Sequence, residues 1–495
     1  MLDATRSARG ALAAGLGMSV AFVVAVFGWF PGAIAAYTGA PVPLAWGLLV
    51  VAAPLVEPEL VTVALARHLA RGRGAGRTAT ALLTACVWVA TEWVFPKLFG
   101  DTLGHGFLAS RLLRQAADVA GAPGLTFVLV LANEGVLGAV GAARRRDGRA
   151  ALAAAAAVVL PLVALAAYGT IRLHQLADGP DSEARLVVGL VQADVAGYDR
   201  LAAERGTFET VRLVLDRHFA LSRDALARGA VDVLVWPETV YPTTFGTPKS
   251  EAGAAFDHEI AHFVSATQVP LVFGAYDAEA GAEFNAAVVL APEGEGRVDF
   301  DTYRKAALFP LTERVPAVVD SAWLRRWLPW LGTWAAGAGG EAVPITLRDG
   351  RTVRIAPLIC YDALVPRLAI AAVRRGAEVI VTLSNDSWFA DGLGPRLHLV
   401  VSAFRSLETR RPQVRATNTG ISAVIDATGE VRAQAGVHER TALVATIVPE
   451  TRATTLVLAW GDWLGPVALG LPLVLLAAAR ALTALSGRRG RGPCW

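Results

Sequence analysis

The sequence predicts an α-helical multi-span membrane domain joined to an α/β domain that lies outside the cytoplasm. Of its 495 residues 54% are apolar and only 18% are charged, whereas soluble domains carry about 25% charged residues. Long uncharged runs occur toward both ends of the chain, and a block of mixed charge lies between them. Arginine clusters flank the apolar runs in a pattern that fixes their orientation. The net charge of +3 gives no broad positive field for nucleic acid.

The membrane domain is predicted from runs long enough to cross a hydrocarbon core, which takes about 20 apolar residues as helix. Five runs precede the polar block and a sixth follows it, at 11–31, 42–66, 78–96, 123–143, 150–168 and 454–479. Segment 97–122 is too polar and glycine-rich to span, so it is expected to be re-entrant or to lie at the surface. Glu57 and Glu59 interrupt the second run and are expected at a polar helix–helix contact. A signal peptide is the alternative for the first run, but its length favours a retained span.

The orientation follows from loop charge. The clusters are Arg6 and Arg9; Arg67, Arg71, Arg73 and Arg77; Arg144, Arg145, Arg146 and Arg149; and Arg488, Arg489 and Arg491. All fall on one side if every run crosses the membrane, and the positive-inside rule makes that side the cytoplasm. The predicted domains are therefore a membrane domain at 1–182, an external catalytic domain at 183–450, and a final span with a basic tail at 451–495.

The external block is patterned as alternating strands and helices. Apolar, β-branched runs that end in polar residues predict strands at 185–192, 231–238, 269–276, 353–362 and 377–386, with helices at 206–228 and 364–375. Strands that are apolar almost throughout indicate sheets buried on both faces. Functional side chains are then expected where strands end and loops begin.

Three reactive side chains lie at or near such ends: Glu238, Lys305 and Cys360. A thiol nucleophile needs a base, and acyl transfer needs positive charge or N–H donors where the oxyanion develops. A carboxylate and an ammonium beside a cysteine could supply both. Each residue alone is more often structural, so only their combination indicates catalysis.

The motifs around these residues carry a family resemblance. WPET (236–239), YRKAALFPLTERVP (303–316), ICYD (359–362) and SNDSWF (384–389) resemble the nitrilase superfamily, whose triad is Glu-Lys-Cys. Together with the sequence of 394–430 and the flanking spans, they resemble the apolipoprotein N-acyltransferases. The resemblance implies a nitrilase-like α-β-β-α sandwich for the external block.

The resemblance also implies the roles of the residues. Glu238 would be the general base, Lys305 would stabilise the tetrahedral intermediate, and the backbone N–H of Tyr361 would add an oxyanion donor. Glu313 would support the lysine, and Asp362 stands where the family usually has Glu.

The reaction so implied has two half-reactions. Cys360 would take an acyl chain from a phospholipid, typically phosphatidylethanolamine, and pass it to the α-amine of the S-diacylglyceryl-cysteine of an apolipoprotein. No cofactor or metal is expected, and a monomer suffices. The location would be the bacterial inner membrane, with the catalytic domain on the periplasmic side.

Aromatic residues beside the motifs are candidates for lipid contact. Trp323, Trp327 and Trp330 lie in segment 321–334 among arginines, a combination that favours the headgroup level. We expect this segment to dip into the leaflet and guard acyl-chain entry, with an ordinary aromatic core as the alternative. Trp388 is a further candidate for substrate contact, although Asn385, Asp386 and Trp388 are expected mainly to shape their loop.

The remaining polar residues are expected to be structural. His398 shows no evident partner in the sequence, and Cys86 and Cys494 are expected to have no role. Four residues are expected to form a network on one helix face: Arg405, Glu408, Arg411 and Arg415.

Three departures from the family pattern keep alternatives open. Six spans are predicted where the family usually has eight, Asp362 replaces Glu, and a family tryptophan after the first strand is absent, with Tyr198 nearby. The alternatives are a membrane-tethered amidase or other nitrilase-type hydrolase, an acyltransferase for a different amine, and a scaffold without turnover. The intact Glu-Lys-Cys set argues against the scaffold.

Overall fold

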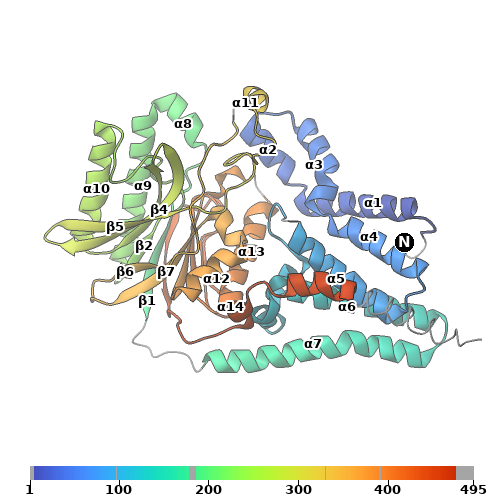
Figure 1. Ribbon diagram of the computed structural model, residues 1–495. Helices are drawn as coiled ribbons and strands as arrows, with labels where there is room; N and C mark the ends of the chain where they lie inside the picture. Colours follow the sequence, from blue (N-terminus) through green and yellow to red (C-terminus); the bar gives the residue numbers. More distant parts are fainter. Residues whose placement is uncertain (1–4, 96, 178–184, 329, 390–391, 475–495) are drawn as a thin grey trace, which may run out of the picture.

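The computed structural model describes residues 5–95, 97–177, 185–328, 330–389 and 392–474. A bundle of helices formed by the first part of the chain lies beside a layered α/β domain (Figure 1). Cys494, the basic tail and the end of the sixth apolar run lie outside the described residues.

The α/β domain is built on two six-stranded sheets, ordered β12-β1-β2-β3-β4-β5 and β11-β10-β9-β8-β7-β6. Strands β1 to β3 are parallel, as are β7 to β9, and the outer pairings are antiparallel. The first sheet contains β1 Leu186–Gln192, β2 Val233–Val235, β3 Leu271–Glu279, β4 Ala282–Gly294, β5 Arg297–Arg304 and β12 Thr441–Ile447. The second contains β6 Val343–Thr346, β7 Thr352–Ile359, β8 Val379–Ser384, β9 Gln413–Thr417, β10 Ala423–Ile425 and β11 Val431–Gln434.

The five predicted strands are confirmed as β1, β2, β3, β7 and β8, which are parallel strands inside the two sheets. Their apolar runs are continuous because both faces are covered. An edge strand such as β5 buries only one of its eight residues and has no such run, so the pattern does not identify it.

The layers follow the α-β-β-α order that was predicted. Valines, leucines and isoleucines of β1, β2, β7, β8 and β9 form a core between the two sheets. Helices α9 (Thr207–Ala227) and α10 (Glu251–Thr267) cover the outer face of the first sheet. Helix α12 (Pro366–Arg374) packs on the outer face of the second, and α13 (Leu393–Thr409) lies on the same side. Two short helices complete the domain: α8 Tyr198–Arg205 and α11 Ala322–Trp327.

The N-terminal part is helical throughout. Its α-helices are α1 Ala8–Phe27, α2 Phe30–Thr38, α3 Val42–Val56, α4 Glu59–Gly72, α5 Arg77–Val94, α6 Ala117–Arg144 and α7 Gly148–Ala177. Among the described residues, three helices are long and apolar enough to cross a membrane, and a bent pair makes a fourth if it counts as one span. Helix α7 lies along one side of the bundle (Figure 1). It exposes apolar side chains such as Leu152, Leu160 and Val163, as expected of a helix that faces lipid.

The second predicted run is not one straight helix. It breaks at Glu57 and Pro58 into α3 and α4, which meet at a bend of 47°. Pro58 has no N–H to donate into the preceding turn, and it disfavours helical backbone at Glu57, where ψ is 70°. The break turns the side chain of Glu57 toward Lys97, with 2.8 Å between Oε2 and Nζ. The expected polar helix contact is thus an ion pair with the segment after α5.

Two other predicted membrane elements differ in detail. Helix α5 matches the third run but carries four threonines between Arg77 and Glu92, so its hydropathy falls below that of the other spans. Segment 97–122 forms two 3₁₀ turns, η2 Leu103–Ala109 and η3 Leu113–Ala116, before α6 begins. The sixth run contains a short helix, α14 Leu456–Trp460, a break at Gly461 and an apolar helix at Leu464–Val474.

Buried ion pairs join the two parts of the chain. Asp118 at the start of α6 lies 2.8 Å from Nη2 of Arg410 and 2.8 Å from Nε of Arg172 on α7. The side chain and backbone carbonyl of Gln115 also accept hydrogen bonds from Arg410. These contacts hold the helical bundle against the C-terminal end of α13.

Candidate active site

The nucleophile candidate lies at the end of β7. Cys360 directly follows Ile359 and begins the 3₁₀ turn η5 (Cys360–Leu364). Its φ of +48° lies in the left-handed region, which costs a residue with a Cβ about 1 kcal/mol or more. Such strain persists where the surroundings enforce it, and here it turns the thiol into a small cavity.

Glu238, Lys305 and Glu313 form a buried charge cluster beside this turn. Lys305 Nζ lies 3.0 Å from Oε1 of Glu238 and 2.7 Å from Oε1 of Glu313. Asn285 on β4 donates to the same Glu238 oxygen at 2.8 Å, and the backbone N–H of Asn385 donates to the other at 2.8 Å. The predicted base and ammonium are therefore held together by fixed donors and acceptors.

Burial and charge set the protonation states in the cluster. Burial and the nearby Glu238 carboxylate hold the pKa of the Cys360 thiol well above its usual value. Lys305 is desolvated too, but Glu238 and Glu313 hold its pKa well above the ordinary range. At neutral pH the resting site therefore contains a thiol and an ammonium, so the thiol must lose its proton to a base during reaction.

Asp362 connects the nucleophile turn to the lysine segment. Its Oδ2 accepts from the N–H of Ile359 at 3.0 Å and from the hydroxyl of Tyr303 at 2.9 Å. Its Oδ1 accepts from the N–H of Ala307 at 2.6 Å and of Ala306 at 3.2 Å. Burial raises the pKa of Asp362 to about 6, although these hydrogen bonds oppose the rise. The shorter side chain therefore has a full set of partners where the family usually has Glu.

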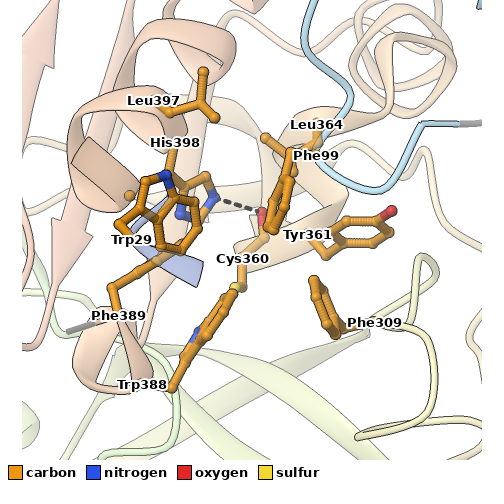
Figure 2. A pocket seen from close by; sticks show the side chains of 11 residues that line it. Trp29, Phe99, Phe309, Cys360, Tyr361, Leu364, Trp388, Phe389, Leu397 and His398 are labelled. Carbon is orange, nitrogen blue, oxygen red and sulfur yellow. Dashed lines mark hydrogen bonds between the residues drawn. The ribbon is translucent and has the colours of Figure 1, made fainter. Parts of the chain in front are cut away.

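Aromatic side chains enclose Cys360 (Figure 2). The cavity measures about 20 Å³, which is room for about one water molecule. Trp29, between α1 and α2, and Phe99, after α5, belong to the helical bundle and line it with Phe309 and Trp388. The hydroxyl of Tyr361 donates to the carbonyl of Lys97 at 3.5 Å. The bundle thus forms part of the wall around the nucleophile.

The sequence that forms the two sheets and holds these residues matches a known family. The model of the carbon-nitrogen hydrolases matches residues 188–455. The chain belongs to the carbon-nitrogen hydrolase family. The model of the apolipoprotein N-acyltransferase N-terminal domain also matches, over residues 1–134, so this carbon-nitrogen hydrolase is of the apolipoprotein N-acyltransferase type.

Relatives with that name resemble the chain over most of its length. The apolipoprotein N-acyltransferase of Chlorobaculum tepidum is 28% identical over 82% of this chain and 78% of its own. That of Shewanella oneidensis is 26% identical over 93% of this chain and 84% of its own. Among solved structures, the carbon-nitrogen hydrolase of Helicobacter pylori G27 is 16% identical and aligns with 54% of this chain and 89% of its own, with a TM-score of 0.37.

The four tryptophan candidates of this carbon-nitrogen hydrolase occupy two places. Trp388 lines the Cys360 cavity and packs on Phe309, with 5.3 Å between ring centroids. Trp323 and Trp327 lie on α11 and are 66% and 69% exposed, so the alternative of a buried aromatic core is wrong for this pair. Trp330 packs edge-on against Tyr37 of α2 at 6.1 Å. Figure 1 shows α11 beside α2 at the edge of the helical bundle.

The structure gives His398 partners that were not evident in the sequence, and the expected network on one helix face is wrong. His398 does have partners: Asp386, Arg415 and the carbonyl of Cys360. Arg405 and Glu408 do pair on α13, at 3.0 Å. However, Arg411 follows the helix and Arg415 lies in β9, so the four residues do not share a helix face. Arg411 instead donates to backbone carbonyls, and Arg415 contacts the loop after β8.

Several site residues in this carbon-nitrogen hydrolase were not predicted. Asn285 was not predicted because its strand was not identified from the sequence. It reaches Glu238 through the pairing of β3 with β4. Trp29 and Phe99 are apolar residues in or beside apolar runs, where nothing in the pattern marks them as cavity lining. Only packing of the bundle against the α/β domain reveals them.

Proposed function

We propose that this chain moves a fatty acyl chain from a phospholipid to the α-amine of an S-diacylglyceryl-cysteine at the N-terminus of an apolipoprotein, through a thioester on Cys360. The observation that carries the proposal is that the helical bundle and the α/β domain both line the cavity around Cys360. Trp29 and Phe99 of the helical bundle lie beside the thiol. A soluble amide substrate needs no apolar bundle at the nucleophile, whereas an acyl chain in a membrane does.

In the first half-reaction, Glu238 takes the proton of the Cys360 thiol as sulfur attacks the ester carbonyl of the phospholipid. Lys305 and the N–H of Tyr361 stabilise the oxyanion that develops. The intermediate then collapses: the C–O bond breaks, Glu238 gives the proton to the departing lysophospholipid oxygen, and the thioester remains.

In the second half-reaction, the free α-amine attacks the thioester carbonyl. Glu238 takes a proton from the amine, and the same two donors stabilise the second oxyanion. The C–S bond breaks and the sulfur leaves, regaining its proton, while an amide forms. Glu313 keeps Lys305 in place by accepting from its ammonium, with its other oxygen held by the N–H of Phe309 at 2.7 Å.

Hydrolysis of the thioester by water is the second candidate, and the described cavity argues against it. Its lining is apolar and aromatic apart from a few residues, so few groups would hold an attacking water, although the volume of about 20 Å³ would admit one. The same small volume means that Trp388, Phe309 or their neighbours must move to admit an acyl chain. An acceptor amine other than the lipoprotein cysteine remains an outcome of the experiment below.

The exposed α11 is proposed as the lipid-contacting element. Trp323 and Trp327 project from the same short helix as Arg325 and Arg326, and tryptophan with arginine favours the headgroup region. Val318, just before α11, is 93% exposed. This segment would dip into the leaflet and guide the phospholipid toward the cavity.

The location follows from the loop charges and the exposed apolar helices. We propose the bacterial inner membrane, with residues 183–450 on the periplasmic side, residues 1–182 as the membrane domain, and residues 451–495 as a final span with a basic cytoplasmic tail. The site is assembled from one chain, so a monomer suffices. A reporter fused after residue 180 should be active outside the cytoplasm, and a cytoplasmic signal would contradict this orientation.

The experiment that tests the function is intact-mass measurement of the purified protein after incubation with phosphatidylethanolamine alone. We expect a fatty-acyl adduct that hydroxylamine removes and that Cys360→Ala lacks. Adding a diacylglyceryl-cysteine peptide should discharge the adduct and yield an N-acyl peptide. Discharge by water at the same rate would favour the hydrolase, and discharge only by another amine would change the acceptor.

A further inference from the structure

His398 contacts the nucleophile through its backbone. The ring comes from the first turns of α13 and lines the Cys360 cavity. Its Nε2 lies 3.3 Å from the carbonyl oxygen of Cys360, the contact drawn as a dashed line in Figure 2. The residue is 3% exposed. The mechanism above gives this histidine no role.

The contact with the carbonyl requires a hydrogen on Nε2 of His398. A carbonyl oxygen only accepts, so Nε2 carries the hydrogen. Burial and the charge of Arg415 lower the pKa of His398, although the charge of Asp386 opposes the shift. Nδ1 lies 3.0 Å from Nη2 of Arg415. The same guanidinium nitrogen lies 3.0 Å from Oδ2 of Asp386.

The network around His398 is enclosed on every side. Ser384 donates to Oδ1 of Asp386 at 2.6 Å, and that oxygen also lies 3.0 Å from Nδ1 of His398. Arg415 and Asp386 are fully buried. A Cβ at Gly420 would come within 2.1 Å of the Asp386 carboxylate, so glycine allows the chain to cover it. The imidazole is therefore held in one orientation.

The carbonyl that His398 contacts shares a peptide unit with the expected oxyanion donor. The C=O of Cys360 and the N–H of Tyr361 lie in one plane. No described peptide bond is cis, so the two groups point in opposite directions. Fixing the carbonyl therefore fixes the N–H. A donor on the carbonyl also polarises the peptide, which strengthens its N–H as a donor.

We propose that His398 is a positioning residue for oxyanion stabilisation: its Nε2–H holds the Cys360 carbonyl and thereby aims the N–H of Tyr361 at the developing oxyanion. The inference rests on the proposed function, because it requires acyl transfer at Cys360. It predicts that His398 matters for steps that form a tetrahedral oxyanion and not for reactions of the thiol that form none.

Two reactions of the same thiol test this. The first is formation of the acyl-enzyme from phosphatidylethanolamine, followed by intact mass over time. The second is alkylation of Cys360 by iodoacetamide, a displacement at a saturated carbon that forms no oxyanion. Full-length His398→Ala should lower the acylation rate about tenfold to a hundredfold, because complete loss of one oxyanion donor costs about a hundredfold to a thousandfold. Its alkylation rate should stay within about twofold of wild type, which also reports that the site is folded.

His398→Gln is the conservative variant, since its side-chain amide can donate to the same carbonyl and should restore most of the acylation rate. His218→Gln is the matched control: His218 is equally buried, with Nδ1 2.7 Å from the carbonyl of Val214, and lies outside the cavity. It should leave both rates unchanged.

Two results with His398→Ala would overturn the inference: an acylation rate equal to that of wild type, or an alkylation rate that falls as much as the acylation rate. It would also be overturned if His398→Gln acylates no faster than His398→Ala, or if His218→Gln loses as much acylation rate as His398→Ala. A wild-type protein that forms no thioester would instead contradict the proposed function. The two failures are therefore distinguishable in one set of measurements.

Discussion

Asp362 Oδ1 lies 2.6 Å from the backbone nitrogen of Ala307, so the residue two positions after the nucleophile holds the segment that follows Lys305. The other carboxylate oxygen accepts from the N–H of Ile359, the residue before the nucleophile. One buried side chain thus sets the distance between two members of the expected triad. Substitution of this aspartate should therefore affect the relative positions of Cys360 and Lys305 and the pH dependence of stability.

Asp362→Asn should weaken the site because an amide presents one accepting oxygen where the carboxylate presents two. Buried donors left without partners cost about 1–3 kcal/mol each, so the thermal midpoint should fall and acylation should slow at least tenfold. Tyr303→Phe removes one donor and leaves the carboxylate, so it should be milder. Equal thermal midpoints for Asp362→Asn and wild type would contradict this role.

The raised pKa of Asp362 gives the same variant a pH signature. Because the folded-state pKa of about 6 exceeds the usual 3.8, the native state binds this proton first as the pH falls. Protonation of Asp362 therefore stabilises the native state. This contribution is fully present below about pH 4 and is lost as the pH rises through about 6. Wild type should therefore gain thermal midpoint relative to Asp362→Asn as the pH falls from 6 to 4. The difference between the two midpoints should stay constant above pH 6.

Glu238→Gln should have opposite effects on two reactions of Cys360. Loss of the general base should slow acyl transfer by about a hundredfold to ten-thousandfold. Loss of the carboxylate charge, which helps to raise the thiol pKa, should shift the pH profile of iodoacetamide alkylation toward lower pH. Alkylation profiles measured from pH 7 to 10 check this. A shift toward higher pH in the variant would mean that Glu238 does not act on the thiol through its charge.

Lys305→Met should impair both catalysis and stability. It removes an oxyanion donor, which costs about a hundredfold to a thousandfold in rate. It also leaves the carboxylates of Glu238 and Glu313 buried without their cation, which destabilises by about 3 kcal/mol. Lys249→Met is the control, because Lys249 pairs with Glu283 at an exposed position, where such a pair contributes about 1 kcal/mol or less. Thermal midpoints and acylation rates measured together separate the two effects.

The double substitution Trp323→Ala with Trp327→Ala should raise the KM for phospholipid in vesicles several-fold and leave kcat little changed. Both side chains are exposed and outside the Cys360 cavity, so their loss removes contact with the lipid surface and not with the reacting atoms. Alkylation by iodoacetamide should be unaffected. A fall in kcat with unchanged KM would place these residues in the chemistry instead.

The sequence by itself determined the strands and helices that can be identified from the pattern and length of their apolar runs. Continuous apolar runs identified β1, β2, β3, β7 and β8, because a strand covered on both faces must be apolar on both. Apolar length predicted the helical bundle, and the orientation inferred from arginine placement stays a prediction. Local motifs named Glu238, Lys305 and Cys360, because each of the three stands in its own motif and a fourth motif follows them in the family's order.

Tertiary structure alone decided which groups meet. The pairing of β3 with β4 brings Asn285 to Glu238, and the packing of the bundle brings Trp29 and Phe99 to the thiol. His398 was expected to be structural, with no partner evident in the sequence, and folding places its ring on the carbonyl of Cys360. Periodicity records which face of an element is buried, but not which element covers it. The partners of a buried polar side chain therefore follow only from the packed chain.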